Sequence, residues 1–211
     1  TRPDARPRRA ARPGRRQPAA VASSLDNRRA AWEGDDEIVI GKRQGLRFDI
    51  LGTWAKNDND IDVATRLANL EDEHKADAVF VDAGYGTGIV SAGKTMGRSW
   101  RLVWFAGEAG DPGCLNKRAE MWKLARDWLK QGGAIQPGDQ VLFDDLIGPE
   151  TVSRLDGKIQ IESKKDMKAR GLPSPNRADS VVLSFAFPVV ARGAHRGARP
   201  FLCAGLPRPR E

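Results

Sequence analysis

The sequence predicts an α/β protein in which a mixed sheet is flanked by helices. Two strand-like segments meet at a Gln44-Gly45 turn, which predicts an antiparallel hairpin. Apolar runs and helix-like segments then alternate along the chain, which is typical of βαβ units with parallel strands. The chain has 211 residues, 40% of them hydrophobic, which is enough for one domain with a substantial core.

The first half of this pattern contains the hairpin, a helix, a buried strand and a glycine-rich turn. Strands are expected at 37–43, 46–54 and 78–83, a helix at 60–75, and the turn, with a short helix, at 84–97. Asp60 is expected to cap the helix, because short polar side chains satisfy the free N–H groups of a helix start. The buried side of that helix is expected to carry Val63, Ala64, Leu67 and Ala68.

The second half contains a strand, a strong helix, two short strands and a last helix. The strands are expected at 101–106, 140–143 and 158–162, and the strong helix at 116–130. The strong helix has one apolar face, which is followed by Gly132-Gly133 as a stop signal. This face consists of Met121, Trp122, Ala125, Trp128 and Leu129.

The last helix, from Arg177, places an acid on its apolar face. Asp179 precedes Val182, Leu183 and Ala186 at spacings that put all four side chains on one face. A carboxylate that faces the core is costly unless something compensates it. The compensation is either a position at the start of the helix, where the helix dipole favours an anion, or a metal ion.

The net charge of +7 belongs to the two ends of the chain. Residues 1–30 hold nine Arg and two Asp, and residues 191–211 hold five Arg and one Glu, whereas 31–190 hold 21 basic and 25 acidic residues. We expect 1–30 to be a disordered Arg/Pro/Ala-rich tail, 31–190 to be the folded domain and 191–211 to be an irregular basic tail. The biased composition of the tails is also what a GC-rich gene yields when it is read out of frame.

Several classes of protein are disfavoured. The two cysteines, Cys114 and Cys203, provide neither a disulfide framework nor a zinc site. The chain contains no secretory signal and no run long enough to span a bilayer. A cytoplasmic location and no membrane partner are therefore expected.

Two nucleotide-binding interpretations apply to the segment after Asp82. Residues 88–95 match the P-loop pattern GxxxxGK[ST], and the apolar run 141–145 ends in two acids, as a magnesium-binding strand does. A P-loop, however, opens directly from its strand and leads into a long helix, which is not expected here. The segment VDAGYGTG also resembles the turn that holds S-adenosylmethionine, with Glu108 available for ribose hydroxyls, but that turn normally follows the first strand.

A third interpretation joins Asp82 and Asp179 in one site. Carboxylates at a strand end and at a helix start are suitable ligands for Mg²⁺ or Mn²⁺, and a pair of such ions suits phosphodiester hydrolysis. Basic residues that precede Asp179 are expected to follow a phosphate backbone into this site. These residues are Lys164, Lys165, Lys168, Arg170 and Arg177.

Three segments, in order, resemble the C-terminal nuclease domain of the large terminase subunit of tailed phages. They read VFVDAGYGTGIV, NKRAEMW and ESKKDMKARGLPSPNRADSVVLSFAF. The resemblance covers roughly 31–190. It implies a ribonuclease-H-like fold and metal-dependent cutting of concatemeric double-stranded DNA. It also implies the phage portal and small terminase subunit as partners, and an ATPase motor that the chain does not supply. Asp82 and Asp179 match the family's second and third catalytic acids.

One departure from the family concerns its first catalytic acid. The family carries that acid in a pattern like GxDxAxxGxD, and alignment of Gly34 and Asp36 with its end puts Arg29 at the acid's position. Asp36 is therefore only a weak candidate ligand. Whether the first strand is present is left open, because SSLDNRR stands where an apolar strand is expected. The sequence thus predicts an impaired nuclease of a prophage remnant, or a DNA-binding remnant without chemistry.

Overall fold

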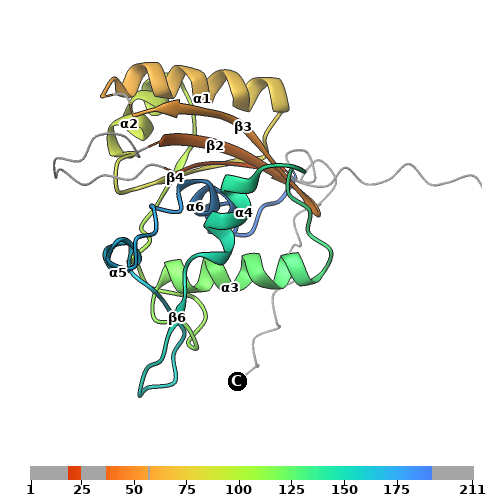
Figure 1. The fold of residues 1–211 in the computed structure, drawn as a ribbon. Coiled ribbons are helices and arrows are strands. Elements are labelled where there is room, and N and C mark those ends of the chain that lie inside the picture. Colours follow the sequence, from red (N-terminus) through yellow and green to blue (C-terminus); the bar gives the residue numbers. More distant parts are fainter. Residues whose placement is uncertain (1–18, 25–36, 57, 192–211) are drawn as a thin grey trace, which may run out of the picture.

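A computed structural model describes residues 19–24, 37–56 and 58–191. Five strands form a mixed sheet in the order β3-β2-β1-β4-β5. β1 lies antiparallel to β2 and parallel to β4, and β5 is parallel to β4 (Figure 1). The strands are β1 (Ala19–Ser24), β2 (Glu37–Gln44), β3 (Arg47–Ala55), β4 (Ala78–Asp82) and β5 (Arg101–Val103).

The central strand β1 lies inside the segment that was expected to be a disordered tail. It pairs with β2 on one side and β4 on the other, so the ribonuclease-H-like sheet has its first strand. The tail expected over 1–30 is therefore wrong for 19–24, and the rest of that segment lies outside the described residues. The sequence AAVASS has a single residue larger than Ser, so apolar patterning does not identify it. Backbone pairing along both edges of β1 satisfies its polar groups instead.

Helices cover both faces of the sheet (Figure 1). α1 (Asp60–His74) and α2 (Thr87–Thr95) pack on one face, where Leu67 and Ile89 join Val81 in a buried cluster. α3 (Lys117–Lys130) and α6 (Asn176–Leu183) cover the other face, where Met121 and Val182 meet Phe80.

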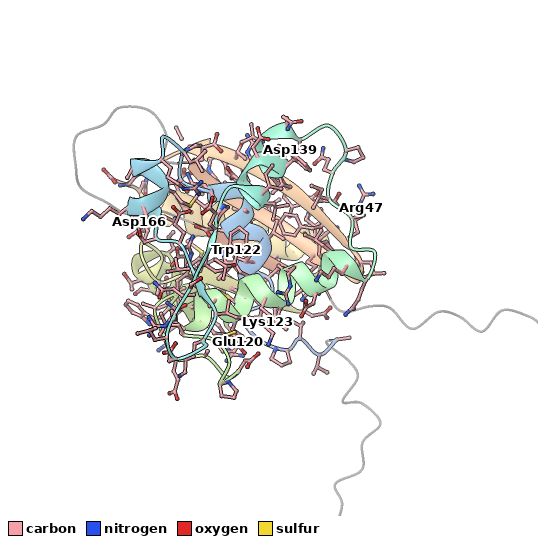
Figure 2. The ribbon with its side chains drawn as sticks, turned by 60° about the horizontal axis from the view of Figure 1, so that its bottom comes forward. Arg47, Glu120, Trp122, Lys123, Asp139 and Asp166 are labelled. Atoms are coloured by element: carbon pink, nitrogen blue, oxygen red, sulfur yellow. The ribbon has the colours of Figure 1, made fainter. Side chains whose placement is uncertain are left out.

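The remaining elements lie beside this second layer. They are α4 (Gln140–Ile147), α5 (Lys164–Ala169) and the strand pair β6 (Thr151–Val152) and β7 (Gln160–Ile161). Figures 1 and 2 show α4, which Asp139 precedes, and α5, which contains Asp166, on either side of α6. No helix within the described ranges is both long and apolar enough to cross a membrane.

Three local expectations are corrected. The segment expected to be a strand at 140–143 is helix α4, whose first turn is capped by Asp139 through the Leu142 N–H. Asn59, not Asp60, caps α1 and accepts from the N–H groups of Ile61 and Asp62. β5 is shorter than expected, because the chain turns after Trp104 and Gly107 donates to the Trp104 carbonyl.

Candidate functional site

Asp82 is the last residue of the buried strand β4. Phe80 lies in the cluster beneath α6, so the alternation of side chains along a strand places Asp82 on the same face. Asp82 is 8% exposed, and its Oδ1 accepts from the Gly84 N–H at 3.0 Å. The strand thus holds a nearly buried carboxylate at its carboxyl end, beneath the helix that carries Asp179.

The direction of α6 brings Asp179 to this same end of the sheet. At the helix start, Arg177 lies 3.5 Å from Glu37, the first residue of β2. Beyond the helix end, the Ser184 Oγ accepts from Arg43, near the end of β2, at 3.0 Å. Since β2 is antiparallel to β1, and β1 is parallel to β4, the start of β2 lies at the carboxyl end of β4. The first turn of α6 therefore lies at the end of the sheet that carries Asp82.

Asp179 is a fully buried carboxylate. Its exposed fraction is 0%, and neither of its oxygens accepts a hydrogen bond from the described residues. The Lys164 ammonium lies 2.8 Å from Oδ2 as an ion pair outside hydrogen-bonding geometry. A buried carboxylate needs such a positive partner, and a divalent cation would satisfy the same requirement. In this structure, the positive charge of Lys164 from α5 compensates the buried negative charge of Asp179.

Asp145 is an acid of this region that the sequence interpretation missed. It lies in α4, is 7% exposed, and its Oδ2 accepts from the N–H groups of Arg177 at 2.9 Å and Ala178 at 3.4 Å. It therefore caps α6 from another helix, in place of Pro175, which provides no capping side chain. Burial raises the pKa of Asp145 to about 6, and the charge of Asp179 adds to this rise. Asp139, a typical residue for a helix start, was the sequence signal that 140–147 is a helix. The strand expected at 140–143 concealed this signal.

The five basic residues expected to contact DNA fall into two groups. Lys164 pairs with Asp179, Arg177 with Asp139 at 2.8 Å, and the Arg170 guanidinium with Glu162 at 2.6 Å and Glu150 at 3.0 Å. These three hold α5 and α6 in place. The other two, Lys165 and Lys168, are exposed on α5, and the described part of the chain shows no ion pair for either.

The glycine-rich segment after β4 is shaped by packing. A Cβ atom at Gly86 would lie 2.2 Å from a Val81 methyl group and 2.5 Å from the Asp82 carbonyl oxygen. Gly88 to Thr95 lie entirely within helix α2, so they cannot wrap a phosphate as a P-loop does. The P-loop interpretation is therefore wrong, as is a magnesium-binding strand at 141–145, which is helical.

The topology also disfavours S-adenosylmethionine binding. The strands β1, β2 and β3 form an antiparallel meander, whereas doubly wound nucleotide-binding sheets are mostly parallel. Glu108 lies five residues beyond the end of β5 and not at the strand end expected for a ribose ligand.

The described residues offer an incomplete set of metal ligands. The oxygen donors Asp82 and Asp179 suit Mg²⁺ or Mn²⁺, and the buried Asp179 oxygens lack hydrogen-bond donors. No group of three or more His, Cys, Asp or Glu side chains in these ranges is placed to hold a metal ion. β1 contributes no acidic residue, and Arg29 and Asp36 lie outside the described residues.

Solved structures similar to this one include nuclease domains of phage terminases. That of the large terminase subunit of bacteriophage Sf6, in a variant solved with calcium, has a TM-score of 0.66 at 19% identity and covers 82% of this chain and 90% of its own. The large terminase nuclease of thermophilic phage G20c has a TM-score of 0.55 at 14% identity, with 83% and 90% covered.

The HK97 bacteriophage large terminase matches as part of a longer protein. Its TM-score is 0.51 at 12% identity, over 81% of this chain and 39% of its own. Other structures of the Sf6 and G20c domains hold manganese, magnesium or cobalt. No model of a known protein family matches the sequence, and no curated protein sequence matches it. The comparisons therefore show the ribonuclease-H-like fold of terminase nuclease domains.

Proposed function

We propose that this chain is a nuclease domain of the kind that cuts concatemeric double-stranded phage DNA during packaging, with an impaired metal site. The observation that carries the proposal is the arrangement of Asp82 and Asp179. They lie at one end of the sheet in a fold shared with terminase nucleases, and Asp179 is buried against Lys164. This arrangement has no evident structural purpose that an apolar residue would not serve better.

Asp82 and Asp179 would hold the Mg²⁺ or Mn²⁺ ion. Such an ion, when bound, supplies an activated water molecule and stabilises charge at the leaving oxygen. The chain's own residues position the two carboxylates: Gly84 orients Asp82, and Asp145 fixes the start of the helix that carries Asp179. With no acid in β1, we expect the cation to bind weakly and the cutting of DNA to be weak or absent.

A plasmid-nicking assay with Mn²⁺ tests the proposal. We expect the wild-type chain to nick supercoiled plasmid slowly or not at all. Robust cutting that Asp82→Ala abolishes would contradict the impairment and confirm the nuclease.

A second variant tests whether an acid in β1 is what the site lacks. The register pairs Ser23 with Val81, so position 24 lies beside Asp82. Ser24→Asp should therefore add the missing carboxylate and increase nicking at least tenfold.

The Ser24→Asp gain needs a matched control. The same variant with Asp179→Asn should lose the gain, because Asn carries no charge to hold the cation. If Ser24→Asp folds but neither nicks plasmid nor binds Mn²⁺ more tightly than the wild type in calorimetry, the metal-site assignment fails.

The second candidate function is DNA binding without chemistry, as expected of a prophage remnant. The observation that favours it is again the missing acid in β1. Inactive wild-type protein that still binds duplex DNA supports this candidate. In either case we place the protein in the cytoplasm of a bacterial or phage-infected cell. Its partners there would be the phage portal and the small terminase subunit.

A further inference from the structure

An apolar pocket of about 380 Å³ lies between α3 and α4. Both helices pack on α6, and no described side chain fills the space that they leave between them. Figure 2 shows Trp122 between the two helices. The walls of the pocket are apolar, and its rim on α3 is basic and exposed. The walls are Trp122, Ala125, Leu129 and Leu146, and the rim is Arg126 and Lys130.

The helix α4 presents large apolar side chains to solvent beside this pocket. Phe143 is 50% exposed and Ile147 is 64% exposed. Both are neighbours of Leu146 on the helix surface, so they continue the apolar wall that Leu146 begins. We call the four wall residues, together with Phe143 and Ile147, the α3–α4 patch. Contiguous exposed apolar surface of this kind marks a contact site in soluble proteins.

The two edges of the α3–α4 patch carry opposite charges. Lys130 is exposed on the α3 side. Asp144 follows Phe143 by one residue and Leu146 follows it by three, so the helical period places these two on opposite sides of Phe143. Asp144 therefore lies on the edge away from α3. In the described part of the chain, Asp144 accepts only from the neutral amide of Gln140, and Lys130 has no ion pair.

We infer that the α3–α4 patch binds the same patch of a second copy of this chain. A two-fold axis along the middle of the patch, parallel to its edges, places the positive edge of each copy opposite the negative edge of the other. A partner of one charge would leave one edge unmatched, whereas a second copy matches both.

The shape of the patch fits the same two-fold axis. That axis places the exposed Phe143 and Ile147 of one copy over the pocket of the other. A cavity of about 150 Å³ is enough to hold a benzene ring, so the pocket has room for either side chain. The inference does not rest on the proposed function, because neither DNA nor a metal ion takes part in the contact.

Sedimentation velocity of the full chain, at roughly 1 to 100 µM, tests the inference. We expect the wild type to form a dimer. Ile147→Ser should weaken association at least about tenfold, because it removes apolar surface that the contact buries. Ile61→Ser is the matched control. Ile61 is also 64% exposed, but it lies on α1, on the opposite face of the sheet, so association should be unchanged.

Charge reversal tests the two-fold arrangement. Lys130→Glu places acids opposite each other across the contact, and Asp144→Lys places bases opposite each other. Each variant alone should therefore associate more weakly than the wild type. An equimolar mixture of the two variants should associate again, because each reversed charge then faces the opposite charge of the other variant. A mixture that associates as weakly as the separate variants overturns the arrangement.

The remaining outcomes also decide the matter. A wild type that stays monomeric over this concentration range overturns the inference, as does association that Ile147→Ser leaves unchanged. Assemblies larger than a dimer overturn the closed two-fold contact. Circular dichroism establishes that each variant is folded. A failure here leaves the proposed nuclease function to its own test, because these measurements contain no DNA and no metal.

Discussion

At the residue scale, Asp145, which caps the start of α6, makes the stability of the protein depend on pH. Its ordinary pKa of 3.8 is raised to about 6, chiefly by burial. Folding therefore takes up a proton between these two pH values. The stability that this uptake contributes is fully present below about pH 4 and is lost as the pH rises to about 6.

Asp145→Asn should remove this pH dependence. The amide oxygen of the variant side chain can still accept from the Arg177 N–H, but the side chain does not ionise. As the pH rises from 4.5 to 7.5, the free energy of unfolding should therefore fall less in the variant than in the wild type. Each pKa unit corresponds to about 1.4 kcal/mol, so the difference from the wild type is at most about 3 kcal/mol. Urea unfolding at the two pH values measures it, with Asp144→Asn, on the exposed side of α4, as the control. The same slope in wild type and variant would contradict the assignment.

The Lys164–Asp179 pair sets a second residue-scale prediction. Lys164→Met leaves the buried Asp179 carboxylate without its cation and should lower the free energy of unfolding by about 3 kcal/mol. The double variant with Asp179→Asn should lose less than the sum of the two single changes, because the unpaired charge is gone. Lys165→Met, at an exposed position of the same helix, should change stability by less than about 0.5 kcal/mol. If the losses in free energy of unfolding from the two single changes simply add in the double variant, Lys164 and Asp179 are not energetically coupled.

At the element scale, β1 is the strand on which the sheet depends. It joins the antiparallel β2–β3 hairpin to the parallel β4–β5 pair. Deletion of 1–18 should leave cooperative thermal unfolding intact, whereas deletion of 1–24 should abolish it, because the sheet would be divided. Differential scanning calorimetry of the two truncations distinguishes them. A folded 25–211 chain would show that β1 is dispensable.

The elements that the sequence predicts are those with a strong apolar period. The apolar faces of α1 and α3 and the buried strand β4 follow directly from residue spacing, and all are confirmed. β1 and α4 are not predicted, for different reasons. β1 is made of small residues and is specified by its neighbours, and α4 carries an apolar run whose length suits either a strand or a helix.

The site divides in the same way. Asp82 and Asp179 are proposed as site residues from motif order, because Asp82 stands at the end of a recognisable strand and Asp179 near the start of a recognisable helix. Asp145 is not found, because its role depends on a contact 32 residues away in sequence, with the Arg177 N–H. The structural use of Arg170 and Arg177 is hidden for the same reason, since charge composition does not reveal which cations are already paired.

At the scale of the whole molecule, positive charge is concentrated at the two ends of the chain. The segment 31–190 has a net charge of −4, whereas the first 18 residues hold seven Arg and one Asp. Attraction to the phosphate backbone should therefore depend on the tails as well as on Lys165 and Lys168.

Deletion of 1–18 should reduce the salt dependence of duplex binding. The slope of log affinity against log salt becomes shallower by about 0.9 for each phosphate that the protein no longer neutralises, and we expect the deletion to release two or more phosphates. Anisotropy titrations between 50 and 200 mM salt measure this slope. Deletion of 192–211 provides the comparison for the second basic tail. An unchanged slope after both deletions would show that the folded domain alone neutralises the DNA.

The packing of α6 against β1 and β2 has a consequence for biosynthesis. The first and last described elements of the chain lie against each other, so the central contacts join residues more than 150 positions apart. Closing so long a loop is slow compared with forming local helices. A ribosome must release almost the entire domain before α6 can dock and bring Asp179 to the end of the sheet. Nascent chains therefore have no assembled candidate site until α6 has left the ribosome.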